Sequence, residues 1–229
     1  MKKETVVISL GGSLIAPDKI DIKFLKKFKE IIYRKRSKYK FIIVCGGGTV
    51  ARKYISALAE LKLSEKFQDF AGISATRMNA RFMNYIFNSN PGVGIPHTIK
   101  DIENSINNQG IIFCGALEYK PHETSDSTAA EIANHFKTNF INLTNVSGLH
   151  DKNPLQHKDA KLIPKISWEG LYKMAKEKEF KPGQHFVIDQ TASRIIMQNK
   201  ITTYILGKDL KQFNNLLNKE KFIGTTVQG

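Results

Sequence analysis

Two short glycine turns are the part of this sequence most able to do chemistry. "LGGS" ends one apolar run at residues 10–13, and "CGGGT" ends another at residues 45–49. Glycine permits a tight turn and lets an anion approach the backbone amides, and a helix that follows the turn adds a favourable dipole. Two such turns at one edge of a sheet predict two phosphate-bearing ligands that face each other, as a phosphotransferase requires.

Neither turn carries a lysine of its own. No lysine stands between Ser9 and Ser13, and neither GxxxxGK[ST] nor GxGxxG occurs, so neither a P-loop nor a dinucleotide site is predicted. We expect the positive charge to come from Arg52, which lies about one helical turn past the second glycine turn and can hold two phosphate oxygens. The alternative is an ordinary exposed helix arginine, comparable with its neighbour Lys53.

Asp126 is a further candidate, whose place beside these turns is implied by the family resemblance described below. It lies just before the predicted helix 127–136. A carboxylate between two phosphates would repel both, so a catalytic role makes sense only if it positions cations. The alternative is an N-cap of that helix, which aspartate forms well, and the two roles can coexist.

The elements that must position these residues alternate along the chain. Apolar runs predict strands at 5–10, 40–45, 110–115, from 139, at 202–206 and at 224–227. Helical spacing predicts helices at 21–36, 50–61, 67–87, 99–107, 127–136, 166–180 and 190–199, with a short helix before the last strand. Such alternation predicts an α/β fold with a mostly parallel central sheet covered by helices on both faces, in one domain. Ligands of such sheets bind at the carboxyl ends of the strands.

The composition excludes several other classes. The chain has 229 residues with 41% hydrophobic content, and no apolar run approaches the roughly 18 residues that span a bilayer. The apolar part of the N-terminus is too short for a signal peptide, so we expect a cytoplasmic protein. Cys45 and Cys114 each end an apolar run, and the six histidines show no ligand spacing, so we predict no metal site built by the protein alone.

The net charge of +14 is concentrated in one segment. Residues 19–40 carry ten Lys and Arg against Asp21 and Glu30. A nucleic-acid patch is one interpretation. We favour a solvated helix face, because Ile22, Leu25 and Phe28, with Ile32 and Tyr33, form an apolar stripe among the lysines.

Six sequence blocks together resemble a known family. "SLGGSLIAP", "VCGGGTVARKYI", "FQDFAGISATRMNA", "TSDSTAAEIA", "LTNVSGLHDKNP" and "VIDQTASRII" have the order and spacing of uridylate (UMP) kinases, archaeal type, in the amino acid kinase family. The resemblance covers nearly the whole chain. It implies a three-layer α/β/α sandwich that transfers the γ-phosphoryl of ATP to UMP with Mg²⁺ on the ATP phosphates, often as a homo-hexamer. It further implies an acceptor-binding lobe at about 1–140 and an ATP-binding lobe at about 141–229.

The resemblance also implies the site residues, position by position. The catalytic set is Asp126, Arg52, Gly12 and Gly48. The UMP-binding set is Gly47, Asp69, Thr124 and Ser125. The ATP-binding set is Ser9, Gly11, Gly12, Ser13, Gly48, Arg52, Thr144, Asn145, His150 and Asn153. For Asp69, an ordinary surface carboxylate is the alternative.

The sequence departs from the family pattern at several of these positions. Ser9 stands where many members carry a lysine, and Asp189 lies where some relatives place another. His150 replaces a tyrosine on the adenine side, and Asn153 replaces an aspartate. These changes affect the catalytic cation and the donor nucleotide more than the fold, and Lys181 and Arg194 are the next candidates for the cation after Arg52.

Two other functions compete with UMP phosphorylation. One is another small-molecule kinase of the family, such as an isopentenyl phosphate kinase, but the histidine that those enzymes place after the triple glycine is absent from "GGGTVARKY". The other is a non-catalytic regulator that binds nucleotides or nucleic acid, which the missing lysines and the positive net charge favour. Within the leading interpretation ATP and UMP are the ligands, and neither nucleic acid nor a membrane is expected as a partner.

Overall fold

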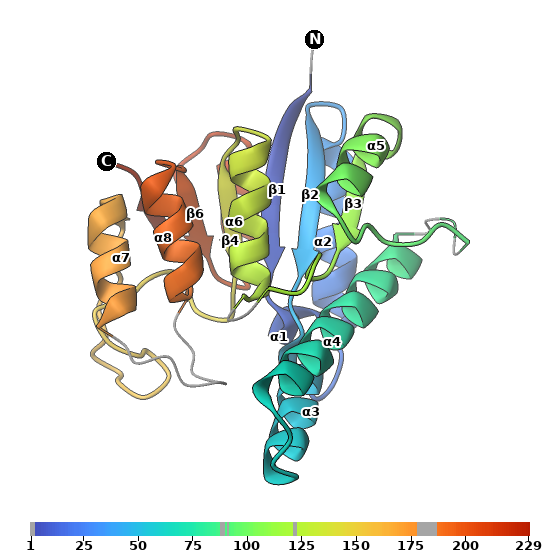
Figure 1. The fold of residues 1–229 in the computed structure, drawn as a ribbon. Coiled ribbons are helices and arrows are strands. Elements are labelled where there is room, and N and C mark those ends of the chain that lie inside the picture. The colour runs from blue at the N-terminus through green and yellow to red at the C-terminus, as the bar shows by residue number, and fades with distance from the viewer. Residues whose placement is uncertain (1–2, 88–89, 91, 121–122, 178–186) are drawn as a thin grey trace.

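The computed structural model describes residues 3–87, 90, 92–120, 123–177 and 187–229 (Figure 1). Within them the chain forms one seven-stranded sheet in the order β3-β2-β1-β4-β6-β7-β5. All neighbouring strands pair in parallel except β6 and β7, which are antiparallel. The strands are β1 (Glu4–Leu10), β2 (Tyr39–Cys45), β3 (Ile111–Cys114), β4 (Phe140–Leu143), β5 (Lys165–Ile166), β6 (Thr203–Leu206) and β7 (Thr225–Val227).

Helices cover both faces of this sheet, which confirms the three-layer architecture. The helices are α1 (Gly12–Ile15), α2 (Ile22–Lys35), α3 (Gly48–Glu60), α4 (Glu65–Ile86), α5 (Ile99–Gln109), α6 (Ser125–His135), α7 (Trp168–Lys176), α8 (Gln190–Gln198) and α9 (Leu210–Leu217). One apolar core joins the sheet to α2, α9 and the C-terminal half of α4. A second core joins the opposite face to α5, α6, α7 and α8.

The central strands are buried on both faces, which explains their continuous apolar sequences. Val7 and Ile8 point to opposite faces of β1, and both are fully buried. Strand β1 pairs with β2 over its whole length, from Glu4 opposite Tyr39 to Leu10 opposite Cys45. Both glycine turns therefore leave the sheet at the same level of its carboxyl edge.

The hairpin of α3 and α4 extends beyond that edge (Figure 1). The C-terminal half of α4 packs on the sheet through Ala80 and Met83, which are fully buried. Its N-terminal half, together with α3, lies past the carboxyl ends of the strands. Within the described residues, this hairpin forms a wall beside the second glycine turn at that edge.

The basic segment is a solvated helix, as expected. Asp21 caps α2 by accepting a hydrogen bond from Phe24 N at 3.0 Å. The buried side of α2 consists of Leu25, Phe28, Ile31 and Ile32. The predicted stripe was wrong at Ile22, which is 54% exposed, because the first turn of α2 lies past the edge of the core that buries the next turns.

Three further sequence predictions needed correction. Residues 165 and 166 form the edge strand β5, so the helix predicted at 166–180 begins at Trp168, with Ser167 as its cap; residues 178–180 lie outside the described part of the chain. The short helix α1 was missed, because four residues are too few to show a periodicity. The helix predicted from 67 starts at Glu65.

No helix in the described residues has the length and apolarity to cross a bilayer.

Candidate active site

The two glycine turns touch each other through their backbones. A Cβ on Gly12 would lie 2.1 Å from the Gly48 nitrogen and 2.6 Å from the Gly46 oxygen, and Gly46 N donates to Leu10 O at 2.9 Å. Gly48 has φ of +62°, in the region that favours glycine. These glycines are therefore required by close backbone approach as well as by the turns themselves.

Each glycine turn leads into a helix whose N-cap has no side-chain hydrogen bond. Gly11 caps α1 and Gly47 caps α3 in this way. The first-turn amides of a helix have no intrahelical acceptors, and a capping side chain would normally use one of them. In the 13-residue helix α3 these amides and the dipole remain available to an anion at the carboxyl edge.

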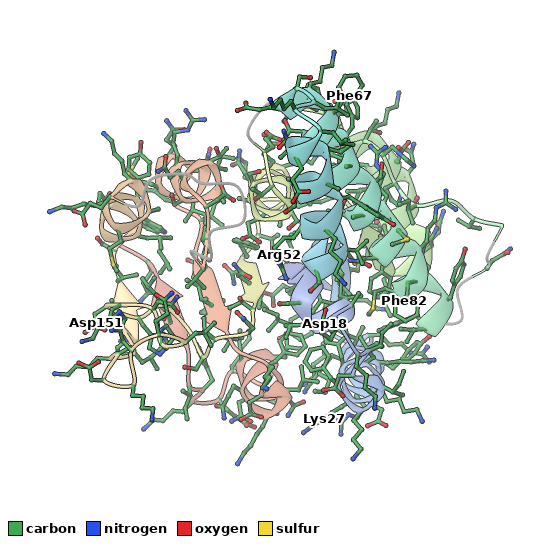
Figure 2. The ribbon with its side chains drawn as sticks, turned by 90° about the horizontal axis from the view of Figure 1, so that it is seen from below. Asp18, Lys27, Arg52, Phe67, Phe82 and Asp151 are labelled. Carbon is green, nitrogen blue, oxygen red and sulfur yellow. The ribbon has the colours of Figure 1, made fainter. Side chains whose placement is uncertain are left out.

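Arg52 and Lys53 differ as the sequence prediction requires. Arg52 is half-buried, one turn into α3, and donates from Nη2 to Thr49 Oγ1 at 3.0 Å. Lys53 points to solvent and meets Asp18 at 4.0 Å, with both side chains more than 70% exposed. Figure 2, which looks at the carboxyl edge, shows Arg52 near the middle of that edge. Of the other candidates for the cation, Arg194 is exposed on α8 and Lys181 lies outside the described residues.

The N-cap alternative for Asp126 is wrong. Helix α6 begins at Ser125, and its cap is Thr124, whose Oγ1 accepts from Asp126 N at 3.1 Å and Ser127 N at 3.3 Å. Ser127 Oγ in turn accepts from Thr124 N at 2.8 Å, which completes a capping box. The Asp126 carboxylate is therefore free of the cap and points to strand β1.

Asp126 belongs to a polar cluster with Ser9, Asn142 and Asp189, in which Ser9 and Asn142 are buried and the two aspartates are half-buried. Ser9 on β1 is fully buried and donates to Asp126 Oδ1 at 2.6 Å. Asn142 on β4 also hydrogen-bonds Asp126, and its Nδ2 donates to Val187 O at 2.7 Å. Thr124 Oγ1 donates to Asp189 Oδ2 at 2.5 Å, while Asp189 Oδ1 caps α8.

This environment shifts the pKa of both aspartates upward. Burial, followed by the nearby charge of Asp189, raises the pKa of Asp126 to about 7, although the hydrogen bonds from Ser9 and Asn142 oppose the shift. Burial likewise raises the pKa of Asp189. The hydroxyl of Ser9 takes the place of a lysine, so this strand brings no positive charge to the pair. Such a pair favours an incoming cation, which would restore both carboxylates to their charged forms.

Four residues predicted to bind ATP line one small hollow. A cavity of about 50 Å³ lies beside Thr144, Asn145, His150 and Asn153, and Lys152 and Val187 complete part of its wall. His150 Nδ1 lies 3.0 Å from the carbonyl oxygen of Gly148, so this nitrogen carries the proton and Nε2 remains an acceptor. Lys152 was missed as a candidate, although it stands inside the quoted block "LTNVSGLHDKNP".

The residues predicted to bind UMP come from the second glycine turn, the first turns of α4 and the start of α6. Asp69 is half-buried in the first turns of α4, on the part of the helix that extends past the sheet. Beside it, Phe70 stacks on Tyr119 of the loop after β3, with ring centroids 4.9 Å apart. Ser125 opens α6, next to the cap residue Thr124. On the other side, Ser13, which was predicted to bind ATP, lies in α1 directly after the first turn.

Helix α4 holds two more residues that sequence reasoning missed. Asn79 donates from Nδ2 to the carbonyl oxygens of Gly46 at 2.7 Å and Gly47 at 3.3 Å. Arg77 donates to the carbonyls of Ala116 and Leu117, which follow β3. The signal available in the sequence was the polar residue Asn79 on the side of α4 that buries Ala80 and Met83.

The comparisons with known proteins agree with this geometry. The model of the amino acid kinase family matches residues 4–207. The chain belongs to the amino acid kinase family. It is 35% identical to a uridylate kinase of Thermoplasma acidophilum over 227 residues, covering 98% of this chain and 96% of that protein. It is 32% identical to a uridylate kinase of Thermococcus kodakarensis, covering 97% of this chain and 99% of that protein.

A solved structure supports the same assignment to this family. The crystal structure of uridylate kinase from Archaeoglobus fulgidus matches with a TM-score of 0.83 and 30% identity, covering 97% of this chain and 99% of that chain. The seven-stranded sheet with helices on both faces is therefore the fold of a family member, as the sequence blocks predicted.

Proposed function

We propose that this protein is a UMP kinase that transfers the γ-phosphoryl group of ATP to UMP and yields ADP and UDP, a step of pyrimidine nucleotide biosynthesis. The observation that carries the proposal is the backbone contact between the two glycine turns at the carboxyl edge, where Gly12 and Gly48 meet. Each turn offers main-chain amides to one phosphate-bearing ligand. The kinship with uridylate kinases supports UMP as the acceptor.

The reaction itself makes few demands beyond alignment and charge stabilisation. An oxygen of the UMP phosphate forms a bond to the γ-phosphorus while the bond to the β–γ bridging oxygen breaks. Because the attacking phosphate is already ionised near neutral pH, no general base has to remove a proton. Aligned amides and a forked guanidinium at Arg52 are suited to this task.

The polar cluster suits a cation that arrives with the substrate. The described residues contain no group of three or more His, Cys, Asp or Glu arranged to hold a metal ion. Mg²⁺ commonly binds through one or two carboxylates together with substrate phosphates, and Asp126 with Asp189 could supply that number. Carried by the ATP phosphates, the ion would neutralise charge on their oxygens. Asp126 would then orient the cation through a carboxylate that Ser9 and Asn142 hold in place.

The two sides of the site take different parts of the ligands. The hollow beside His150 and Asn153 marks the side on which the adenosine of ATP would lie, although at about 50 Å³ it would have to widen to take the base. Thr144, which also lines it, lies next to Gly11 of the first turn. Asp69 would accept hydrogen bonds from the nucleoside of UMP, and Ser125 would close on it from α6. An acceptor with an isoprenoid tail would gain nothing from Asp69, which argues against isopentenyl phosphate.

The surface of the α3–α4 hairpin supports a homo-oligomer. Among the described residues, large exposed apolar side chains concentrate there: Tyr54, Leu61, Leu63, Phe67, Phe70, Met78 and Tyr85. Exposed apolar patches of this kind mark interaction surfaces, and a second copy of the chain is the partner we propose. Light scattering on the wild type and on Phe67→Glu tests this, and a monomeric wild type would overturn it.

A single assay tests the proposed activity. Release of ADP is followed with UMP, CMP, AMP and isopentenyl phosphate as acceptors, in parallel with oligonucleotide binding at two salt concentrations. We expect UMP to give the highest kcat/KM and oligonucleotides to bind weakly. Failure of every acceptor, combined with oligonucleotide binding that falls steeply with salt, would instead support a nucleic-acid-binding regulator. A preference for isopentenyl phosphate would indicate that the protein is a different small-molecule kinase of the same family.

A further inference from the structure

One turn of α4 contacts two separate backbone segments of the acceptor side. Asn79 is 3% exposed and reaches the second glycine turn, and Thr76 and Arg77 reach residues 115–117 at the end of β3. These contacts join parts of the chain that lie 32 to 40 residues apart. The same helix carries Asp69 about three turns earlier.

The buried carbonyl of Gly46 needs a donor that the sheet does not provide, whereas the half-buried carbonyl of Gly47 also accepts from Ala51 N in α3 at 3.3 Å. For the amides of 47–49 to face an anion, the carbonyls of Gly46 and Gly47 must point the other way, into the protein. Buried carbonyls without partners are costly, so their orientation depends on the group that they meet. Nδ2 of Asn79 meets both of them, at 2.7 and 3.3 Å. Because both neighbours are acceptors, the side-chain amide must present its nitrogen here.

The end of β3 is held in the same manner. Ala116 N donates to Thr76 Oγ1 at 2.9 Å, and Arg77 Nε donates to Ala116 O at 3.1 Å. A Cβ on Gly115 would lie 2.6 Å from Arg77 N, so the helix backbone rests directly on the strand end. This segment leads into the loop that ends at the α6 cap.

We propose that Asn79 is a positioning residue for phosphoryl transfer, which orients the second glycine turn for the acceptor phosphate, and that Arg77 positions the strand end 115–117 beside it. The proposal deepens the proposed function and rests on it. Asn79 touches neither substrate in this scheme and acts through the carbonyls of Gly46 and Gly47. The acceptor side is thus ordered before UMP arrives, by hydrogen bonds from one rigid helix.

Three substitutions at Asn79 separate positioning from packing. Asn79→Ala removes the donor, Asn79→Leu removes it while filling the space, and Asn79→Asp presents an acceptor to two carbonyls. We expect all three to raise KM for UMP about tenfold and to lower kcat, with KM for ATP within about threefold of wild type. In Asn79→Asp, KM for UMP should recover as the pH falls from 8 to 6, because the new carboxyl becomes a donor when it is protonated.

The matched control is Met83→Ala. Met83 lies one turn further along α4, is fully buried in the core, and is not among the side chains that hold the site loops. This variant should lower the melting temperature at least as much as Asn79→Ala and leave both KM values unchanged. If Met83→Ala alters KM for UMP as much as Asn79→Ala does, the role of Asn79 is structural and the proposal fails.

Arg77 provides a second test should the Asn79 variants not fold. Arg77 is only partly buried, and Arg77→Met keeps its apolar stem while removing the bonds to Ala116 and Leu117. Arg81→Met makes the same charge change one turn away at an exposed position. We expect a rise of about fivefold in KM for UMP for Arg77→Met and none for Arg81→Met. Equal effects of the two variants would overturn this half of the proposal.

A direct binding measurement separates this proposal from the proposed function. UMP and inorganic phosphate are titrated, without ATP, into the wild type and Asn79→Leu. Weaker binding of both to the variant supports the positioning role, whatever acceptor the enzyme turns over. Unchanged binding of both overturns it, even if the wild type phosphorylates UMP. Failure of the wild type to phosphorylate UMP, with phosphate binding still weakened in the variant, would overturn the acceptor assignment alone.

Discussion

The proposed acceptor side and the proposed donor side of this site are built in different ways. On the acceptor side, buried side chains of a 22-residue helix hold the backbone turn, chiefly Asn79. On the donor side, the hollow is formed chiefly by the irregular segment 144–155, which is anchored to β6 and β7 through Thr144 N to Leu206 O and Leu149 N to Thr225 Oγ1. The hydrogen bonds of its outer residues 150–155 stay within residues 147–162, such as His150 to Gly148 and Leu155 N to Asn153. Long-range bonds from a packed helix leave a site little freedom, whereas local bonds within a loop constrain only the loop itself.

This difference suggests where selectivity resides. A pre-ordered acceptor side loses binding energy whenever a ligand fails to match it, so it discriminates among acceptors. A loop-built donor side adapts more easily, which fits the substitutions at His150 and Asn153 relative to the family pattern. Substitutions on the acceptor side should therefore change KM for UMP selectively, while those that touch the transferred group should change turnover.

The largest effect is expected at Arg52, which lies between the two sides. Arg52→Ala should lower kcat by at least roughly 10²-fold, since an arginine on a transferring phosphoryl group can contribute on the order of 10³. UMP affinity measured without ATP should stay within a few-fold. Steady-state kinetics and equilibrium titration provide these numbers.

Lys53→Ala is the control for Arg52, because it removes an exposed charge from the adjacent position. It should change kcat by less than about twofold, in keeping with the small contribution of an exposed ion pair. If the two variants behave alike, Arg52 is not the missing charge. Arg194 and Lys181 would then be substituted next.

Asp126→Asn should separate catalysis from stability. It keeps the size of the side chain and the acceptor for Ser9 but removes the charge, so kcat should fall by roughly 10²-fold in a folded protein. Because the pKa of Asp126 rises from 3.8 to about 7 on folding, the folded state binds its proton more tightly than the unfolded chain does. The contribution of this group to the stability of the wild type is therefore lost as the pH rises from about 4 to about 7.

The Asn variant lacks this titration. Above pH 7 it should be more stable than the wild type, by about 1.4 kcal/mol for each unit of pKa shift, and the difference should vanish below pH 4. Denaturant unfolding at pH 4, 6 and 8 measures this trend, and Asp189 contributes a slope of the same sign. Wild-type turnover in the variant would remove Asp126 from the mechanism.

Asp69→Ala tests selectivity on the acceptor side. KM for UMP should rise about tenfold while KM for ATP changes by less than about threefold, because the lost hydrogen bonds involve only the nucleoside of the acceptor. Glu65→Ala, in the first turn of the same helix at an exposed position, is the control and should have no effect. An unchanged KM for UMP would leave Asp69 as an ordinary surface carboxylate.

The smallest effect is expected on the donor side, at His150. His150→Tyr restores the residue type of the family pattern and should change KM for ATP by no more than about threefold, with KM for UMP unchanged. Comparing ATP with GTP as donors would show whether the ratio of their kcat/KM values shifts. A change of more than tenfold in KM for ATP would mean that the donor side is as rigid as the acceptor side.

Local sequence patterns determined most of the architecture of this protein. Doubly buried strands appear as continuous apolar runs, amphipathic helices show a period of 3.6 residues, and glycine-rich ends mark where backbones approach. From these patterns follow the α/β alternation, the carboxyl edge as the site and the contrast between Arg52 and Lys53. Sequence analysis missed the two-residue strand β5 and the four-residue helix α1, because neither is long enough to show a periodic pattern of apolar residues.

Contacts between distant residues were decided only by the tertiary structure. Ser9 and Asp126 are 117 positions apart, and the sequence around neither residue predicts the 2.6 Å hydrogen bond from Ser9 Oγ to Asp126 Oδ1. The N-cap of α6 went to Thr124 rather than Asp126 because β1 supplied another partner for the carboxylate. Asn79 looks like an ordinary polar residue until α4 packs beside the second glycine turn and the buried carbonyl of Gly46 requires its donor. Periodicity encodes which face of an element is buried, but the partner on the other side of that face depends on how the elements pack.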